Sequence, residues 1–567
     1  MSFLGFPPRT KSAWESNEVN FPFWFEQTTL SRVIDRVRCS SIFNQRGKNV
    51  TNQQQDVDKN IGGDDLGSLE GDAITNSLVL GWDGDSDPRH PRNWSRRCKI
   101  MITILLSWVK CFFTIVFVSR LKISRLYSFI VYCGSSICIL SYDAIMVRYG
   151  YTREVASLLL STYKFVRITN LKMSKDGTGP MLFSPLSEIP RIGRNPPYII
   201  SFFLYVVVSI ILGSSAVDNF PAIVILRFFQ GFFGSPCLAT AGASIGDIYD
   251  SEASQYALVL WVACIYCGPA LGPLFASRTI SLQQNWRWPF WQIVLMAGPF
   301  LLILVCLLPE TLPEALLAHR AKKLRQAGDV RICAPCEISQ GSSPQSILRA
   351  MIKPVEITIK DPAIAFTCAY SALVYATYYS FFEAFPLVYI DDYQMSTVPF
   401  AMVFLSIIVG CAFGSPIYIV YIWYHQSSRS RPFLQESLLL PAIFGVVLAP
   451  IGLFIFAWSD QAGTINWSVP TAGIVIYTGS IFLVYQALLS YIPYSYPKFA
   501  ASLFAANDFV RSISAAVFIM VTPYLYANIG VPKGVTILGS ISVLGIVGML
   551  ILYRYGANMR ARSRFAG

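Results

Sequence analysis

The sequence has few charged residues. Only 14% of its 567 residues are Asp, Glu, Lys or Arg, whereas 53% are apolar and the mean hydropathy is +0.47. A chain of this length cannot bury so much apolar surface in one water-soluble core. Apolar segments of about 20 residues, long enough to cross a membrane, recur between residues 100 and 553. We therefore expect an all-α integral membrane protein rather than a soluble enzyme.

Motifs for ATP use, metal binding and catalysis are also lacking. The sequence contains no G-x-x-x-x-G-K-[ST] loop, no H-E-x-x-H motif and no catalytic triad signature. The two C-x-x-C pairs, Cys264/Cys267 and Cys333/Cys336, have no partner ligands at zinc spacing. We therefore expect no enzymatic activity, no cofactor and no metal. Uphill transport would have to draw on an ion gradient.

The net charge of +12 does not indicate a nucleic-acid partner, because the basic residues lie in short loops and at the termini. Residues 1–98 are polar and predict a cytoplasmic, largely disordered tail. The central loop, 309–361, and the tail, 554–567, carry basic clusters, which places them in the cytoplasm by the positive-inside rule. Within the loop, Leu316, Leu317 and Leu324 at helical spacing predict an amphipathic helix on the inner leaflet.

Twelve membrane spans are expected, six on each side of the central loop. The first six form an N-terminal bundle within 99–308, and the last six form a C-terminal bundle within 362–553. The predicted spans are 100–146, 154–187, 197–215, 221–243, 255–277, 288–308, 362–388, 397–420, 437–457, 467–489, 500–527 and 533–553.

Basic residues interrupt the first two spans near 118–130 and 164–176. Each cation at the centre of a membrane costs about 2.5 to 3.5 kcal/mol on insertion scales. We interpret the two segments as insertions from retained introns. The alternative is a divergent protein in which both segments loop out of the helices.

The stretch SPLSEIPRIGRNPPYII places Glu188, Arg191 and Arg194 in a short turn between spans 2 and 3. Prolines end one helix before this turn and restart another after it. Carboxylate and guanidinium groups there can pair with each other and with helix ends as two helices slide past one another. These three residues therefore predict a conformational latch.

This stretch resembles the signature loop of the major facilitator superfamily. RFFQGFFGSPCLATAGASIGD, which contains Arg227, resembles the family's fourth-span motif, and CGPALGP resembles the fifth-span motif of its antiporters. WDGDSDPRHPRNWS, LPET and ASLFAANDFVRS resemble the fungal twelve-span drug:proton antiporters, including benomyl and caffeine resistance transporters. The resemblance implies a fold of two six-helix bundles and a role for Arg227 in proton coupling. The helix-kink motif is Gly268, Pro269, Gly272 and Pro273, which we interpret as structural.

Charged residues inside predicted spans are candidates for proton coupling. Arg227 needs a partner or a water-filled cavity there, and the alternative to coupling is that it only pins helix packing. No histidine lies in a span, so an intramembrane proton carrier would be a carboxylate. Glu383 and Asp508 are the candidates. Arg511 is three residues from Asp508, so these two can also neutralise each other.

Tyr375, Tyr379, Phe382 and Glu383 fall on one side of span 7 by their spacing. Aromatic faces around one acid suit a flat or cationic guest. The alternative is that these rings pack against lipid or neighbouring helices. Together with Gln230 they are the candidate substrate-cavity residues.

We expect a proton-coupled exporter of small amphipathic or aromatic compounds, working by alternating access in the lipid bilayer of the fungal plasma membrane. A monomer with both termini cytoplasmic is expected, and its other partner is the small-molecule substrate. One alternative is an importer or facilitator of a nutrient, polyamine or siderophore on the same fold. Another is a non-transporting product disabled by the two insertions.

The orientation predicts where an N-glycan can be added. Asn466 lies in the turn between spans 9 and 10, which we place outside, whereas Asn49 lies in the cytoplasmic tail. A lengthened sequon at 466 should be glycosylated and one at 49 should not, as read by a mobility shift that glycosidase reverses. The reverse pattern would overturn the orientation.

Overall fold

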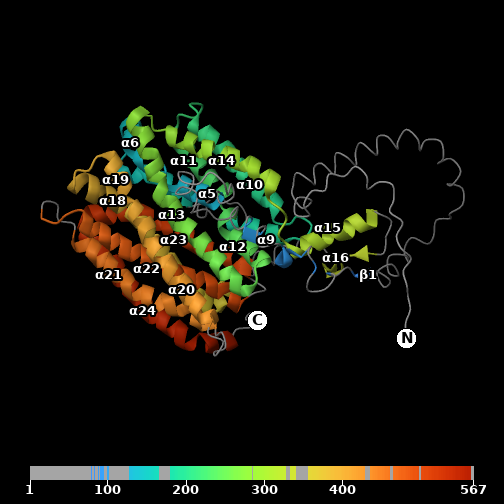
Figure 1. The fold of residues 1–567 in the computed structure, drawn as a ribbon. Helices are drawn as coiled ribbons and strands as arrows, with labels where there is room; N and C mark the ends of the chain where they lie inside the picture. The colour runs from blue at the N-terminus through green and yellow to red at the C-terminus, as the bar shows by residue number, and fades with distance from the viewer. Residues whose placement is uncertain are drawn as a thin grey trace, which may run out of the picture.

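The computed structural model describes residues 78–79, 82, 87, 90–94, 99–100, 102, 127–164, 179–283, 285–326, 332–339, 356–427, 435–459, 464–496 and 500–562. These residues are helical except for turns and one pair of two-residue strands. Figure 1 shows the helices in two groups, with the green N-terminal group above the orange and red C-terminal group.

The N-terminal bundle is built from helices that precede the central loop. They are α5 (Tyr127–Ser136), η4 (Ile139–Ser141), α6 (Tyr142–Tyr149), α7 (Arg153–Ala156), α8 (Leu158–Lys164), α9 (Gly179–Glu188), α10 (Asn195–Gly213), α11 (Phe220–Gly234), α12 (Pro236–Ile248), α13 (Ser251–Gln283) and α14 (Trp288–Leu307).

The C-terminal bundle follows the loop. Its elements are α18 (Pro362–Phe385), the π-helix η5 (Pro386–Asp392), α19 (Thr397–Val403), α20 (Leu405–Ser427), η6 (Gln435–Leu439), α21 (Leu440–Trp458), α22 (Ser468–Ser495), α23 (Ala500–Ile529) and α24 (Val531–Arg562).

Nine helical segments in the described part of the chain are long and apolar enough to cross a membrane. The other three predicted spans fall short for identifiable reasons. Residues 165–178 of span 2 lie outside the described residues. Span 4 breaks at Pro236, which has no N–H for the carbonyl of Phe232, and the Ser235 hydroxyl donates to that carbonyl instead (2.7 Å). Span 7 is α18, whose four tyrosines and Glu383 make it less apolar.

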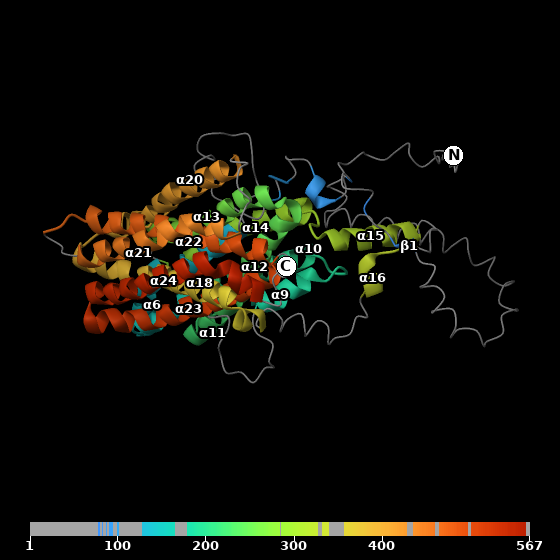
Figure 2. The same ribbon diagram turned by 90° about the horizontal axis from the view of Figure 1, so that it is seen from below.

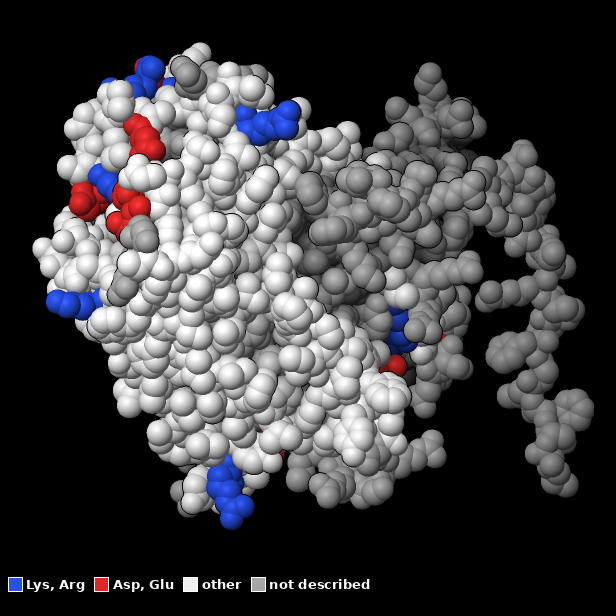
Figure 3. All heavy atoms as spheres, turned by 60° about the vertical axis from the view of Figure 1, so that its left-hand side comes forward, with Lys and Arg blue, Asp and Glu red and all other residues white. Residues whose placement is uncertain are grey.

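The outward surface suits a membrane. Figure 3 shows a face on which charged side chains gather toward the ends and a broad uncharged band lies between them. Large apolar side chains are exposed on these helices, among them Phe203, Leu302, Phe413 and Leu544. Such a surface is too apolar for water but matches the hydrocarbon of a bilayer.

The two bundles meet along a continuous interface. Helix α13 of the first bundle packs against α20 and α22, and α23 of the second packs against α8, α9 and α12. Figure 2 shows the helices running side by side, with α15 and α16 projecting beyond one end. We call this the loop end and the opposite one the far end.

The central loop forms a small unit with part of the N-terminal tail. Its elements are α15 (Pro313–Gln326), β2 (Ile332–Cys333) and α16 (Pro335–Ser339), and β2 pairs in parallel with β1 (Leu78–Val79) of the tail. Arg320 also forms an ion pair with the buried Asp87 of the tail (3.6 Å). A few described residues of the tail, Leu78, Val79 and Asp87, therefore contact the central loop.

Helix α15 does not use its apolar side for lipid as predicted. Leu316 and Leu317 are buried, and Leu324 packs against the small cluster formed by Ala321, Ile332 and Ala334. The predicted helix is present, but protein covers Leu316 and Leu317 and part of Leu324, so Leu316 and Leu317 do not face lipid. Its place on the inner leaflet stays a prediction.

The predicted insertions extend into ordered structure at one end each. Ser128, Phe129 and Ile130 are buried in α5, so the C-terminal end of the segment 118–130 is part of a packed helix. Lys164 ends α8 and is also buried. The remaining residues, 118–126 and 165–176, lie outside the described part of the chain.

The CGPALGP motif shapes the packing of α13 on α5. Pro273 has no N–H to donate to the carbonyl of Pro269, and the Ser136 hydroxyl of α5 donates to that carbonyl instead (2.6 Å). A Cβ added at Gly272 would lie 2.8 Å from the carbonyl oxygen of Cys133. The motif thus allows close approach of two helices, as a structural role requires.

We predict that Gly272→Ala lowers the unfolding temperature of the detergent-purified protein by several degrees. The added methyl group meets backbone of α5, and overpacking of this kind costs about 1 to 3 kcal/mol. Gly246→Ala on α12 is the matched control, because nothing lies within 4 Å of its added Cβ. Equal unfolding temperatures for the two variants would contradict the proposed close approach.

Candidate functional site

Arg227 of α11 is fully buried, and it is hydrogen-bonded through all of its guanidinium nitrogens. Its Nε donates to the carbonyl oxygen of Leu159 (3.2 Å), Nη1 to that of Gly134 (3.0 Å) and Nη2 to that of Ser135 (3.1 Å). The same nitrogens also reach Gln230 Oε1 and Cys138 Sγ. Its described partners are therefore backbone carbonyls and neutral side chains.

These contacts explain why span 1 can break in the membrane. Helix α5 ends at Ser136, and η4 begins at Ile139, so the carbonyls of Gly134 and Ser135 lie beside the break. Arg227 supplies the donors that those carbonyls need. Gln230 also serves this arrangement, because its Oε1 accepts from Arg227 and its Nε2 donates to Ser209 Oγ (2.7 Å). The structure thus gives Arg227 and Gln230 packing partners within the N-terminal bundle.

The centre of the interface holds a cluster of tyrosines around Arg511 of α23. The guanidinium of Arg511 forms an ion pair with Asp508, and its Nη2 also donates to the hydroxyl of Tyr132 (3.3 Å). Its Cζ lies 4.4 Å from the centroid of the Tyr375 ring and 5.2 Å from that of Tyr485. The predicted pairing of Asp508 with Arg511 is present, and it lies against residues of both bundles.

A second cation, Lys164, lies in the same cluster. Its Nζ donates to the Tyr375 hydroxyl (3.1 Å) and lies 4.4 Å from the centroid of the Tyr379 ring. The Tyr379 hydroxyl is hydrogen-bonded to Ser135 Oγ (3.2 Å), and its ring stacks with Phe382 (5.3 Å). The three aromatic residues predicted on span 7 thus form one row, in which Tyr375 and Tyr379 contact the N-terminal bundle.

Glu383 differs from its neighbours on α18. It is 2% exposed, and within the described part of the chain both its carboxylate oxygens are buried without a hydrogen-bond partner. Its charge interacts at longer range with that of Arg153. A carboxylate without donors is unfavourable at membrane depth unless a proton or a cation neutralises it.

At the loop end, Arg194 is held by groups other than those predicted. Its Nε pairs with Asp247 of α12 (2.6 Å), and its backbone N–H donates to Glu310 Oε1 (2.9 Å). Glu310 also accepts from the backbone N–H groups of Asn195, Thr311 and Leu312. This carboxylate therefore fastens the turn before α10 to the end of α14.

The other latch residues divide between two positions. Glu188 accepts a hydrogen bond from Ser502 of α23 across the interface (3.4 Å). Burial raises the pKa of Glu188, and Arg194 only partly offsets this. Arg191 is exposed. Arg194 therefore joins Asp247 and Glu310 within the first bundle, and Glu188 contacts the second bundle, while a latch role for the predicted residues stays a prediction.

The far end has its own polar contacts. Asp218 is partly exposed and accepts from Arg148 and Tyr149, and these hydrogen bonds lower its pKa to about 2. Across the bundles, Arg153 lies 3.9 Å from Asp391. Polar contacts therefore connect the two bundles both here and at the loop end.

Sequence reasoning did not identify several of these groups as functional. Asp247 enters the sequence reasoning only as the last residue of RFFQGFFGSPCLATAGASIGD, Glu310 only as part of LPET, and Lys164 only as part of an insertion. Tyr266 has no charge, belongs to no motif and lies inside an apolar span. A carboxylate within a few residues of the end of a predicted span is the signal that could have drawn attention to Asp247 and Glu310.

Comparisons with known proteins identify related chains. The profile described as "Major Facilitator Superfamily" matches residues 126–519, beginning beside α5. The MFS-type transporter pyvG of Aspergillus violaceofuscus is 36% identical over 496 residues, 86% of either chain. The cycloheximide resistance protein of Candida maltosa is 31% identical over 517 residues, 88% of either chain. Fluconazole resistance protein 1 of Saccharomyces cerevisiae is 29% identical, covering 85% of this chain and 84% of that protein.

Solved structures support the fold. The proton:xylose symporter XylE bound to 6-bromo-6-deoxy-D-glucose aligns with 82% of this chain and 96% of its own, with a TM-score of 0.53 and 12% identity. A partially occluded inward open conformation of XylE from E. coli gives a TM-score of 0.51 at 13% identity, over 81% of this chain and 98% of its own. The expected architecture of two six-helix bundles is confirmed.

The contacts of Arg227 predict that its replacement destabilises the N-terminal bundle. Arg227→Ala leaves buried carbonyls without donors, and each such carbonyl costs about 1 to 3 kcal/mol of stability. The unfolding temperature of this variant and its uphill efflux should therefore both fall. Arg227→Lys should retain part of each, because an ammonium has three donors instead of five. An unchanged unfolding temperature with lost efflux would favour coupling over packing, and normal uphill efflux by Arg227→Ala would remove the residue from the mechanism.

Proposed function

Because the chain belongs to the Major Facilitator Superfamily, we propose that it is a proton-coupled exporter of small amphipathic, often aromatic compounds. The names of its relatives support this class of cargo, since they include cycloheximide and fluconazole resistance proteins and multidrug transporters. The observation in this chain that carries the proposal is Glu383 of α18, a carboxylate that is buried without a donor among the described residues and whose charge interacts with that of Arg153 in the first bundle.

Glu383 has the properties of a proton site. No described hydrogen-bond donor contacts its side chain, so binding a proton would lower the free-energy cost of keeping this carboxyl group buried. Asp508 is less suited to release and rebind a proton, because the guanidinium of Arg511 already pairs with it. Glu383 lies three residues before η5, where the α-helix changes to a π-helix, a rearrangement common at functional sites.

Alternating access would use the two sets of contacts between the bundles. At the loop end, these contacts include Ser502 with Glu188 and Tyr256 with Gln426 (2.9 Å). At the far end, Arg153 lies near Asp391. Breaking one set while keeping the other would open the centre to one side at a time. We place the loop end and both termini in the cytoplasm of a cell whose plasma membrane holds the transporter.

The test replaces the carboxyl of Glu383 with its neutral isostere. Glu383→Gln resembles the protonated side chain but cannot release a proton, so it should abolish uphill efflux while retaining downhill exchange of the same compound. Efflux of a fluorescent compound from a pump-deficient yeast is measured with and without a proton uncoupler. Wild-type efflux should be lost with the uncoupler.

Glu356→Gln is the matched control, because this carboxylate pairs with Lys360 at the surface before α18. It should keep uphill efflux. Uncoupler-sensitive uphill efflux by Glu383→Gln would remove Glu383 as the proton carrier. Lower efflux in wild-type cells than in cells lacking the protein would contradict export and favour import.

A further inference from the structure

The cluster at the interface contains hydrogen-bond donors without acceptors. Arg511 is 1% exposed, and in the described part of the chain its Nε and Nη1 have no hydrogen-bond partner. Tyr266 of α13 is fully buried, and its hydroxyl likewise lacks a partner among the described residues. Burying an unmatched donor costs about 1 to 3 kcal/mol, and more for a charged one.

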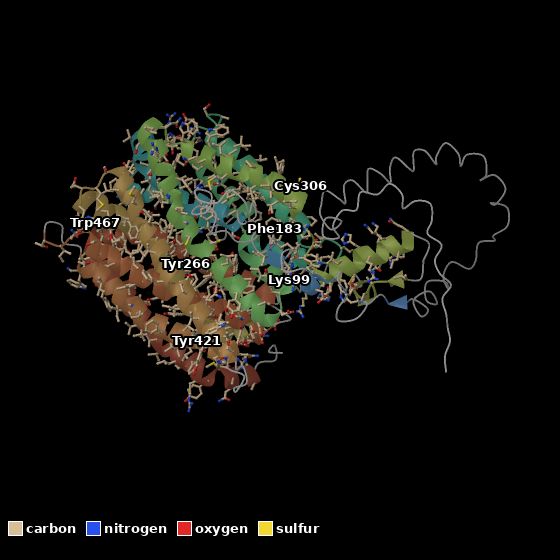
Figure 4. All side chains as sticks on the ribbon, in the orientation of Figure 1. Lys99, Phe183, Tyr266, Cys306, Tyr421 and Trp467 are labelled. Carbon is tan, nitrogen blue, oxygen red and sulfur yellow. The ribbon has the colours of Figure 1, made fainter. Side chains whose placement is uncertain are left out.

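These donors lie together at the centre of the molecule. The ring of Tyr485 lies near both residues, with its centroid 5.7 Å from that of the Tyr266 ring and 5.2 Å from the Cζ of Arg511. Figure 4 shows Tyr266 in the middle of the bundle, between Trp467 toward one end and Lys99 toward the other. The unmatched donors therefore lie where an alternating-access transporter exposes its substrate to each side in turn.

The charges around these donors favour a negative guest. Arg511 and Lys164 both contact Tyr375, and the carboxylate that pairs with Arg511 in the described structure is that of Asp508. Two further nitrogens of the same guanidinium, Nε and Nη1, are the donors that a guest would meet. In a medium of low dielectric constant, hydrogen bonds from a guanidinium are stronger to an anion than to a neutral acceptor.

We propose that this cluster is a binding subsite for the acidic group of the substrate, a carboxylate or an enolate on a flat, largely aromatic compound. The inference rests on the proposed export function and names its substrate class. The anionic oxygens accept hydrogen bonds from Arg511 Nε and Nη1 and from the Tyr266 hydroxyl. The ring system lies among the tyrosines of α13, α18 and α22 once the bundles part.

The same contacts disfavour the cationic guest expected from the aromatic side of span 7. A cation binds over the face of an aromatic ring. In this structure Arg511 already lies over Tyr375, and Lys164 lies over Tyr379. A positive guest would therefore compete with two internal cations for these rings, whereas a negative one would be attracted by them.

The test compares two dyes that share a xanthene ring system, anionic fluorescein and cationic rhodamine 6G. Binding to the purified full chain in lipid nanodiscs is followed by fluorescence anisotropy. Wild-type protein should bind fluorescein at least about ten-fold more tightly, since one charge-assisted hydrogen bond is worth about that factor. Tyr266→Phe and Arg511→Lys should each weaken fluorescein binding about ten-fold and leave rhodamine 6G unaffected.

Tyr266→Phe is the informative variant, because it removes only a hydroxyl that has no described partner and should not reduce stability. Tyr418→Phe, at a buried tyrosine of α20 outside the cluster, is the control and should bind both dyes as wild type does. Tighter binding of rhodamine 6G, binding of neither dye, or unchanged fluorescein affinity in Tyr266→Phe would each overturn the proposal. Dye binding is measured without a proton gradient. A failure of the binding prediction can therefore be told apart from a failure of the proposed export function, which is tested by uncoupler-sensitive efflux.

Discussion

Arg227 is fully buried, and its guanidinium connects α11 to α5 and α8 by hydrogen bonds. The break in span 1 leaves the carbonyls of Gly134 and Ser135 beside this arginine, and the guanidinium donates to both. Each group needs the other, because a free carbonyl and a free cation are both costly in a membrane. The course of span 1, and with it the position of Tyr132 and Ser135 at the interface, depends on this contact.

Arg511 presents the opposite arrangement in the second bundle. Both arginines are buried, yet within the described residues Arg227 has an acceptor for every nitrogen, whereas Nε and Nη1 of Arg511 have none. Glu383 and the Tyr266 hydroxyl are similarly unmatched. A protein that only needed stability would not keep such groups unmatched, since each costs free energy. Their placement near the interface is the observation on which the proposed proton site and substrate subsite rest.

The contacts at the two ends of the interface are weaker than those within each bundle. Between described residues, the loop-end contacts include the hydrogen bond of Tyr256 with Gln426 and that of Ser502 with Glu188, and at the far end Arg153 and Asp391 are 3.9 Å apart and partly exposed. Partly exposed ion pairs contribute little stability. By contrast, Arg194, Asp247 and Glu310 join elements of one bundle. This difference supports the proposal that the bundles move relative to each other by exchanging the contacts at the two ends.

The sequence by itself determined that the protein is a helical membrane protein with two six-span halves around a central loop, because hydropathy and loop charge are local properties of the chain. It also placed Asp508 and Arg511 on one helix face, since residues three apart on a helix are neighbours. Only the tertiary structure decided that Arg227 serves backbone carbonyls, that Asp247 and Glu310 hold Arg194, and that Tyr266 and Lys164 join the tyrosine cluster. Whether a buried polar group is satisfied depends on partners from distant segments, and neither composition nor spacing specifies which segments those are.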